Sequence, residues 1–178
     1  MAAFGVRPAL LSDIDAVARI HVASWQRAYR GQIPDAVLDA LDAAERARKW
    51  VEWLDKPGHR LQVAVAVHDA AVVGFCSLIR SRDSDARDDV GEVGALYVDP
   101  ACWRSGAGTA LMSAAVAEAG AANYSAITLW VLTSNTSARQ FYEHIGFVPD
   151  GGSKVETIGG HALAHVRYRR DVGSGVEL

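Results

Sequence analysis

The sequence predicts a single domain of mixed α and β structure, in which helices cover both faces of one mixed sheet. Segments with the apolar pattern of strands and of helices follow one another in the order β-α-α-β-β-β-α-β-α-β-β, which gives a sheet of about seven strands. The chain has 178 residues, the size of one ordinary domain, and no repeat, low-complexity tract or linker divides it. We therefore expect residues 1–178 to form one α/β domain.

Composition and charge argue against several kinds of protein. Hydrophobic residues make up 50% of the chain, yet no run approaches the about 18 apolar residues of a membrane span. The formal net charge is −3, which argues against nonspecific binding to nucleic acid. The start Met1–Phe4 lacks the features of a signal peptide, and Cys76 and Cys102 stand in no metal or redox spacing. We expect a cytoplasmic protein whose partners include neither membrane nor nucleic acid.

The first third of the chain predicts a strand followed by helices. Residues 6–9 form a short strand, which Pro8 limits to a sheet edge or a strand end. Ser12-Asp13 is placed to cap a helix that ends at Gly31, since apolar residues recur between them at helical spacing. Residues 36–54 form one broken helix or two.

The middle of the chain predicts a hairpin, a loop and a central strand. Residues 61–68 and 71–79 are strands joined by a tight turn. The polar and charged stretch 81–89 is typical of a mobile loop. Residues 92–98 form the next strand, which Asp99-Pro100 ends because proline cannot donate to a sheet.

A glycine-bearing turn, Arg104-Ser-Gly-Ala-Gly-Thr109, follows this strand and leads into a helix over residues 110–122. Free amides and the positive end of the helix dipole make such a helix N-terminus suited to a phosphate. The turn lacks the lysine of a P-loop, and Leu111 stands where a dinucleotide fingerprint has its third glycine. By itself the turn is either another kind of anion site or simple loop geometry.

The last third predicts a strand, a capped helix and a hairpin. Residues 127–133 form the strand, and Ser134–Thr136 offers three residues that can cap the helix 136–145, which Gly146 ends. A final hairpin joins the strands 153–158 and 161–170 through a two-residue turn, Gly159-Gly160. Residues 171–178 are an expected frayed end.

The two central motifs together resemble those of the GCN5-related N-acetyltransferase (GNAT) family. The first is the strand end Leu96–Pro100 with the turn Arg104–Gly108; the second runs from Asn135 to Phe147. The match covers most of the chain, although Trp103 stands where the family turn usually has Gln or Arg. The resemblance implies a mixed, mostly antiparallel sheet that splays between the strands ending at Val98 and Thr133, with the pantetheine arm in the gap.

The resemblance also implies direct transfer of an acetyl group from acetyl-coenzyme A (acetyl-CoA) to a primary amine in a ternary complex. Backbone amides of the turn would hold the pyrophosphate, because glycine there lets a phosphate approach the main chain: Arg104, Gly106, Ala107, Gly108 and Thr109. The backbone of Leu96 and Val98 would face the acetyl carbonyl and the pantetheine amides. Asn135 would be a helix cap, a cofactor contact, or both.

Two residues are candidates for acid and base. The phenol of Tyr142 can protonate the leaving thiolate, whose conjugate acid is slightly stronger than a phenol; alternatively Tyr142 is one aromatic of an apolar helix stripe. Glu92 shares a strand face with Leu96 and Val98 and is the candidate base that takes the amine proton. Its alternative interpretation is a solvent-facing glutamate at the start of a strand.

Trp25 and Tyr29 lie where this family often builds its acceptor pocket, and their rings could stack on a substrate or belong to the core. His161 and His165 share a strand face without a third ligand, so we expect no metal. Cys102 has no readable His–acid partner that would make it a nucleophile.

The acceptor predicted from the sequence is a small-molecule amine. A protein N-terminus or lysine stays open as an alternative, as does a non-catalytic module on the same fold that binds or senses acyl-CoA. A homodimer is consistent with the family and with the long terminal hairpin, which presents an edge.

Overall fold

The computed structural model describes residues 4–173. Residues 1–3, and residues 174–178 of the expected frayed end, lie outside the described part of the chain.

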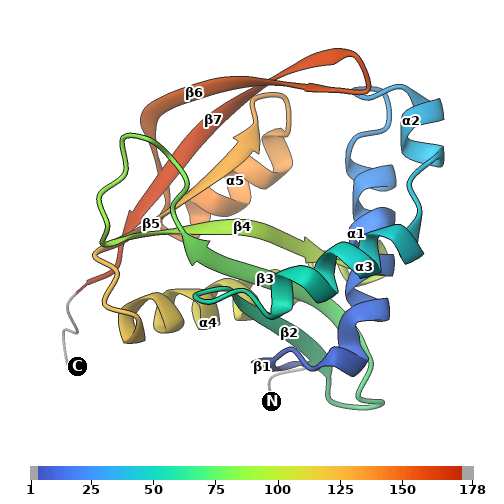
Figure 1. The fold of residues 1–178 in the computed structure, drawn as a ribbon, viewed down its shortest axis with the longest axis horizontal. Coiled ribbons are helices and arrows are strands. Elements are labelled where there is room, and N and C mark those ends of the chain that lie inside the picture. Colours follow the sequence, from blue (N-terminus) through green and yellow to red (C-terminus); the bar gives the residue numbers. More distant parts are fainter. Residues whose placement is uncertain (1–3, 174–178) are drawn as a thin grey trace. The chain divides into compact units, whose positions relative to one another are not determined.

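The helices and strands follow one another in the predicted order (Figure 1). The strands are β1 (Phe4–Pro8), β2 (Arg60–Ala66), β3 (Val72–Arg80), β4 (Val90–Val98), β5 (Ala126–Leu132), β6 (Val148–Ile158) and β7 (His161–Asp171). The α-helices are α1 (Ile14–Ala28), α2 (Asp35–Asp39), α3 (Ala43–Leu54), α4 (Ala107–Ala121) and α5 (Thr136–His144). Two short 3-10 helices are η1 (Leu11–Asp13) and η2 (Pro100–Cys102).

The strands form a seven-stranded sheet with the order β1-β2-β3-β4-β5-β7-β6. β4 and β5 pair in parallel, whereas β1 with β2, β2 with β3, β5 with β7 and β7 with β6 pair antiparallel. The predicted mixed and mostly antiparallel sheet is therefore confirmed. The described chain divides into two compact units, one comprising the chain up to Leu78 with Ala95–Ala115, the other Ile79–Gly94 with the chain from Val116 onward.

The first unit has helices on both faces of its strands. α1 and α3 lie side by side and bury a core against β2 and β3 (Figure 1). The buried residues of this core are Ile14, Val17, Ile20, Trp50, Leu61, Val63 and Phe75. Gly74 points to the opposite face, where a Cβ would lie 3.1 Å from the side chain of Leu111 in α4. Glycine at this position lets α4 pack closely on β3.

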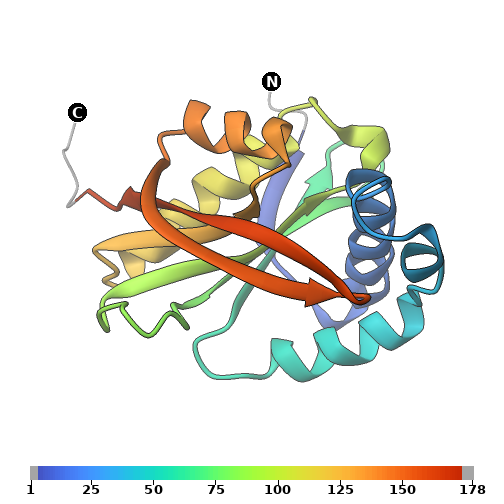
Figure 2. The ribbon, with the colours of Figure 1, turned by 90° about the horizontal axis from the view of Figure 1, so that it is seen from above.

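The second unit carries α5 and the long β6–β7 hairpin (Figure 2). α5 begins at the predicted residue, Thr136, and ends one residue before the predicted end, at His144. Asn135 caps it by accepting a hydrogen bond from the Ala138 amide (3.1 Å), and Gly146 follows it with φ 88°. The Phe147 amide donates to the Tyr142 carbonyl and the Gly146 amide to the Glu143 carbonyl, which is the Schellman pattern.

The hairpin turn also forms as predicted, because Gly159 and Gly160 both have positive φ (57° and 81°). β6, however, begins at Val148 rather than at residue 153. A register shift between Pro149 and Ser153 allows a proline and two glycines inside the strand. Residues of this type depress any strand prediction, so only pairing with β7 creates the first part of β6.

Asp13 does not cap α1 as expected. Its carboxylate is buried, accepts a hydrogen bond from the Leu10 amide (2.7 Å) and forms an ion pair with Arg7 (2.6 Å). This pairing holds the pKa of Asp13 below its usual range, chiefly through the hydrogen bonds from Arg7. The carboxylate thus ties the end of β1 to the start of α1.

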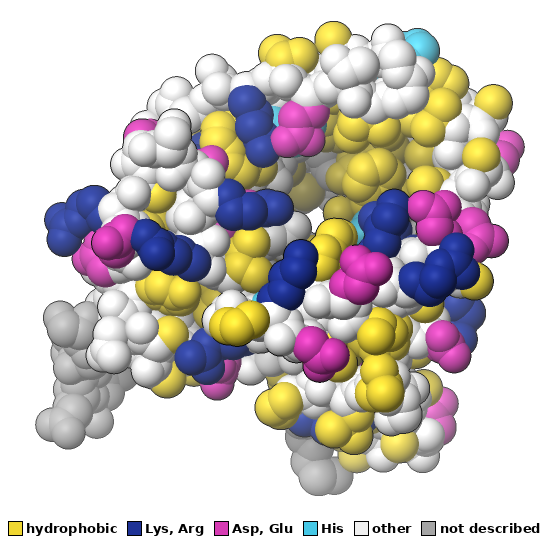
Figure 3. Space-filling view, viewed as in Figure 1, with side chains coloured by type: hydrophobic (Ala, Val, Ile, Leu, Met, Phe, Trp, Pro, Cys, Tyr) yellow, Lys and Arg dark blue, Asp and Glu magenta, His cyan; other side chains and the backbone are white. Residues whose placement is uncertain are grey.

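Within residues 4–173, no helix combines the length and the apolar character that a bilayer crossing needs. On the face drawn in Figure 3, basic and acidic side chains are intermixed. Both cysteines, Cys76 and Cys102, are free thiols.

Candidate active site

The turn after β4 is built from a proline and two left-handed residues. Asp99 caps η2 by accepting a hydrogen bond from the Ala101 amide (2.9 Å), with Pro100 at the first helical position. Arg104 and Gly106 then adopt positive φ (62° and 94°), which costs a non-glycine residue roughly 1–2 kcal/mol. The chain thus reverses in a few residues and enters α4 at Ala107.

α4 begins three residues earlier than the sequence predicts, so Ala107, Gly108 and Thr109 form its first turn rather than part of the loop. The Ala110 amide donates to the Gly106 carbonyl (3.0 Å), and helix geometry leaves the amides before it without acceptors inside the helix. A Cβ at Gly106 would meet nothing within 4 Å, so the space above the turn is open and only the positive φ requires glycine. The earlier start assigns three of the predicted phosphate-binding amides to a helix N-terminus.

The last residues of β4 present a strand edge. The Asp99 amide donates to the Val73 carbonyl of β3 (2.8 Å), so strand alternation turns the backbone groups of Leu96 and Val98 away from β3. The Val98 carbonyl accepts hydrogen bonds from two side chains, the Ser24 hydroxyl (3.0 Å) and the Trp103 indole (2.7 Å). The β4–β5 ladder joins residues 90–93 with 126–129, at the other end of β4.

Trp25 of α1 and Tyr29, the residue that follows α1, belong to an aromatic cluster with Tyr97 of β4. The Trp25 indole donates to the Tyr97 hydroxyl (2.9 Å), and the rings of Trp25 and Tyr29 meet edge to face with centroids 5.1 Å apart. Burial raises the pKa of the Tyr97 phenol. Trp25 and Tyr29 are both half-buried, an exposure that is compatible with core packing and with a pocket wall.

His21 packs against this cluster, with its ring centroid 5.8 Å from that of Trp25. The sequence pattern gave no signal that His21 has a functional environment. Its ring stacks on Tyr97 at 4.7 Å between centroids, and its Nδ1 accepts a hydrogen bond from the Trp50 indole (3.2 Å). Burial, followed by the charge of Arg46, lowers the pKa of His21 to about 3. The imidazole is therefore neutral at pH 7, with its proton on Nε2.

In the second unit, Glu92 is buried rather than solvent-facing, with 3% of its surface exposed. Its Oε2 accepts a hydrogen bond from the Arg82 amide (3.1 Å), and its Oε1 pairs with the Arg82 guanidinium at 2.5 Å. The interpretation of Glu92 as a solvent-facing glutamate at the start of a strand is thus wrong. As a base, Glu92 would need a lone pair that Arg82 does not occupy, and the Arg82 side chain is 68% exposed.

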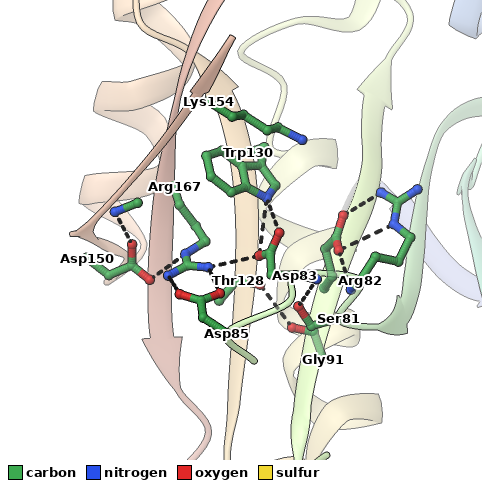
Figure 4. A network of polar contacts seen from close by, with 12 residues as sticks. Ser81, Arg82, Asp83, Asp85, Gly91, Thr128, Trp130, Asp150, Lys154 and Arg167 are labelled. Atoms are coloured by element: carbon green, nitrogen blue, oxygen red, sulfur yellow. Dashed lines mark hydrogen bonds and ion pairs between the residues drawn. The ribbon is translucent and has the colours of Figure 1, made fainter. Parts of the chain in front are cut away.

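The loop after β3, expected to be mobile, is held by ion pairs (Figure 4). Arg167 of β7 contacts the carboxylates of Asp83 (3.1 Å), Asp85 (2.7 Å) and Asp150 (2.8 Å), which raises the pKa of its guanidinium. Asp83 also accepts a hydrogen bond from the Trp130 indole (3.0 Å). Sequence reasoning missed this network because its members lie up to 84 residues apart.

In the second unit, the ring of Tyr142 packs against other aromatic rings. Its ring centroid lies 5.4 Å from that of Phe141, 6.0 Å from that of Phe147 and 6.4 Å from that of Tyr168. The ring is half-buried, so the apolar-stripe interpretation describes part of its role. Its role as an acid stays a prediction.

His161 and His165 each contact a nearby backbone carbonyl through Nδ1, at 3.1 Å. Among the residues that the structure describes, no group of three or more His, Cys, Asp or Glu side chains could hold a metal ion.

Comparison with known proteins identifies the family to which this fold belongs. The family model "Acetyltransferase (GNAT) family" matches residues 17–147. The chain belongs to the GNAT family. Family membership confirms the predicted acyltransferase class and, with the strand order, the predicted fold.

Two relatives illustrate the GNAT match in sequence. The chain is 33% identical over 133 residues to YuaI of Bacillus subtilis, an uncharacterised N-acetyltransferase, covering 74% of this chain and 73% of YuaI. It is 29% identical over 154 residues to an uncharacterised N-acetyltransferase of Mycobacterium tuberculosis, covering 85% of this chain and 92% of that protein.

Two solved structures share the GNAT fold. The putative acetyltransferase yncA of Salmonella typhimurium, solved with acetyl-CoA, has a TM-score of 0.74 at 19% identity and covers 98% of this chain and 97% of its own. The PaiA N-acetyltransferase of Thermoplasma acidophilum, solved with coenzyme A, has a TM-score of 0.70 at 18% identity and covers 94% of this chain and 98% of its own.

Proposed function

We propose that this GNAT protein transfers the acetyl group of acetyl-CoA to the primary amine of a small molecule, by direct attack in a ternary complex. The observation that carries the proposal is the turn from Arg104 to Thr109, which combines open space above Gly106 with the N-terminus of a long helix. Acetyl-CoA supplies an activated thioester; the chain supplies binding groups, an acid and a base.

The turn fits the donor's pyrophosphate. Two negatively charged phosphates need several amide donors and space close to the main chain. The backbone amides of Arg104, Gly106, Ala107, Gly108 and Thr109 are the donors we propose. The structural neighbours solved with acetyl-CoA and coenzyme A support acetyl-CoA as the donor.

The edge of β4 fits an extended amide chain. The backbone groups of Leu96 and Val98 point away from β3, and we propose that they bind the acetyl carbonyl and the pantetheine amides. A fixed amide aimed at the charge that develops on the thioester oxygen is worth about 3–4 kcal/mol. We also propose that Asn135, besides capping α5, contacts the donor.

Acid and base are assigned to Tyr142 and Glu92. The pKa of a phenol is close enough to that of the coenzyme A thiol for the phenol to protonate the leaving thiolate at its sulfur. Glu92 accepts the amine proton once Arg82 turns away, which its exposed side chain permits. The acceptor contacts Trp25 and Tyr29, whose rings can cover a cation or stack on a ring.

We also propose a homodimer that forms at the sheet edge presented by the β6–β7 hairpin. β6 is the last strand in the sheet order, and Val148 and Val155 on it are 60% and 67% exposed.

Calorimetric titration with acetyl-CoA tests the donor assignment, with NAD and ATP as control ligands. We expect saturable binding of acetyl-CoA alone, abolished by Gly108→Trp, which places an indole in the first turn of α4. Gly5→Trp is the matched control, because a Cβ at Gly5 meets nothing within 4 Å and β1 lies elsewhere in the sequence. Absence of binding at millimolar acetyl-CoA would refute the proposal; binding justifies a screen of amines by release of free thiol.

A further inference from the structure

The carbonyl of Val98 has both of its acceptor positions in use. A carbonyl oxygen has two lone pairs, and here one accepts from the Ser24 hydroxyl and the other from the Trp103 indole. The Trp103 bond is the shorter, at 2.7 Å against 3.0 Å. A third donor can therefore bind this oxygen only if one of the two side chains leaves it.

The two side chains differ in how readily they can leave. Ser24 is 3% exposed within α1, where its rotamer is confined by the neighbouring helix turns. Trp103 is 43% exposed and follows η2 in extended backbone conformation. An exposed indole on a loop can change rotamer without displacing core atoms, whereas a buried serine cannot. Trp103 is thus the removable partner.

We propose that Trp103 is a gate on the donor's amide chain: its indole holds the Val98 carbonyl, and a pantetheine amide must replace it there. This inference rests on the proposed function, which assigns the Val98 backbone to the donor. It gives a role to the residue that stands where the family usually has Gln or Arg. The exchange is one N–H···O bond for another, so no charge moves and no covalent bond changes.

The exchange sets the size of the effect. A neutral hydrogen bond contributes modestly in net terms, which corresponds to about two- to tenfold in an equilibrium constant. The apparent affinity for the donor is proportional to the fraction of molecules in which Trp103 has left the carbonyl. Removal of the indole N–H should therefore tighten donor binding by about two- to tenfold.

The first measurement follows the indole itself. The chain has five tryptophans, so a ¹H–¹⁵N spectrum contains five indole N–H signals. The spectrum of Trp103→Phe identifies the Trp103 signal. On saturation with coenzyme A, we expect this signal to move from the position of a bonded N–H to that of an N–H in water.

A fragment of the donor separates exchange at Val98 from a general movement of the turn. 3′-Phospho-ADP carries the pyrophosphate but no pantetheine, so it should shift the backbone amides of Gly106 and Gly108 and leave the Trp103 indole in place. An indole signal that stays in place with coenzyme A, or that moves equally with 3′-phospho-ADP, would overturn the inference.

The second measurement is calorimetric. Trp103→Phe should bind coenzyme A about two- to tenfold more tightly than the unmodified chain, while 3′-phospho-ADP binds equally to both. Trp53→Phe is the matched control, because Trp53 packs against Trp50 in α3 and should leave both affinities unchanged. Unchanged or weaker coenzyme A binding by Trp103→Phe contradicts the gate. Failure of the unmodified chain to bind acetyl-CoA would instead refute the proposed function, so the two failures are distinguishable.

Discussion

His21 makes the free energy of unfolding depend on pH between about pH 5 and pH 7.5, a range in which most carboxylates of the protein stay ionised. The His21 pKa is about 3 in the folded chain against 6.5 for a free imidazole, because burial disfavours the charged ring. A depressed pKa means that the unfolded chain binds more protons than the folded chain between these values. Stability is therefore complete above pH 6.5 and falls as the pH drops below it.

The size of this loss of stability depends only on the pKa of His21 in the unfolded chain, because its pKa in the folded chain lies well below the pH values used. Each pH unit below 6.5 removes about 1.36 kcal/mol, so the free energy of unfolding should be lower by about 2 kcal/mol at pH 5 than at pH 7.5. Protonation would add the second proton at Nδ1, which then could no longer accept the hydrogen bond from the Trp50 indole, and the Nε2–H has no acceptor in the structure. The ring must then leave its stack on Tyr97 or unfold with its surroundings.

Urea unfolding at a series of pH values measures this loss, with His21→Gln as the comparison. Glutamine keeps an acceptor for the Trp50 indole but does not titrate, so its variant should show a flatter dependence between pH 7.5 and pH 5. The difference between the two slopes isolates His21 from the other histidines. Parallel curves for the two proteins would refute the reasoning, whatever the absolute stability of the variant.

Three further predictions concern the acid, the loop and the helix cap. Tyr142→Phe should lower kcat by about 10²- to 10⁴-fold with acetyl-CoA affinity unchanged, measured by thiol release and calorimetry; an unaltered rate removes Tyr142 as the acid. Arg167→Met should lower the free energy of unfolding in urea by about 2 kcal/mol, between the values for surface and buried pairs, because the Asp83 and Asp150 side chains, each 16% exposed, would lose their cation. Asp85→Asn, at a 65% exposed position of the same network, should cost less than about 1 kcal/mol, and equal losses would contradict the burial argument. Asn135→Ala should cost about 1 kcal/mol in the same assay through loss of the cap, and no change would show that the cap is dispensable.

Local sequence was sufficient wherever a few neighbouring residues decide the structure. The cap at Asn135, the left-handed Gly146 after α5 and the Gly159-Gly160 turn all form as predicted, because each depends on backbone conformation within one turn. The spacing of the two central motifs was likewise sufficient for the family, which the match over residues 17–147 confirms.

Local sequence failed where pairing partners are distant. The proline and glycines at the start of β6 argue against a strand, yet β7 pairs with this segment across a bulge. The charges of residues 81–89 are typical of a solvated loop, yet Asp83 and Asp85 meet Arg167. In both cases the deciding contact comes from a strand far along the chain.

The site itself divides in the same way. The sequence by itself determined that a strand, a glycine-bearing turn and a helix N-terminus follow one another at the Arg104–Thr109 turn, because φ preferences and helix periodicity act between neighbours. Only the tertiary structure decided that Ser24 and Trp103 both hold the Val98 carbonyl and that Glu92 is a buried partner of Arg82. Side-chain partners of this kind depend on how helices and strands pack, and the pattern of residues along any one segment does not encode that packing.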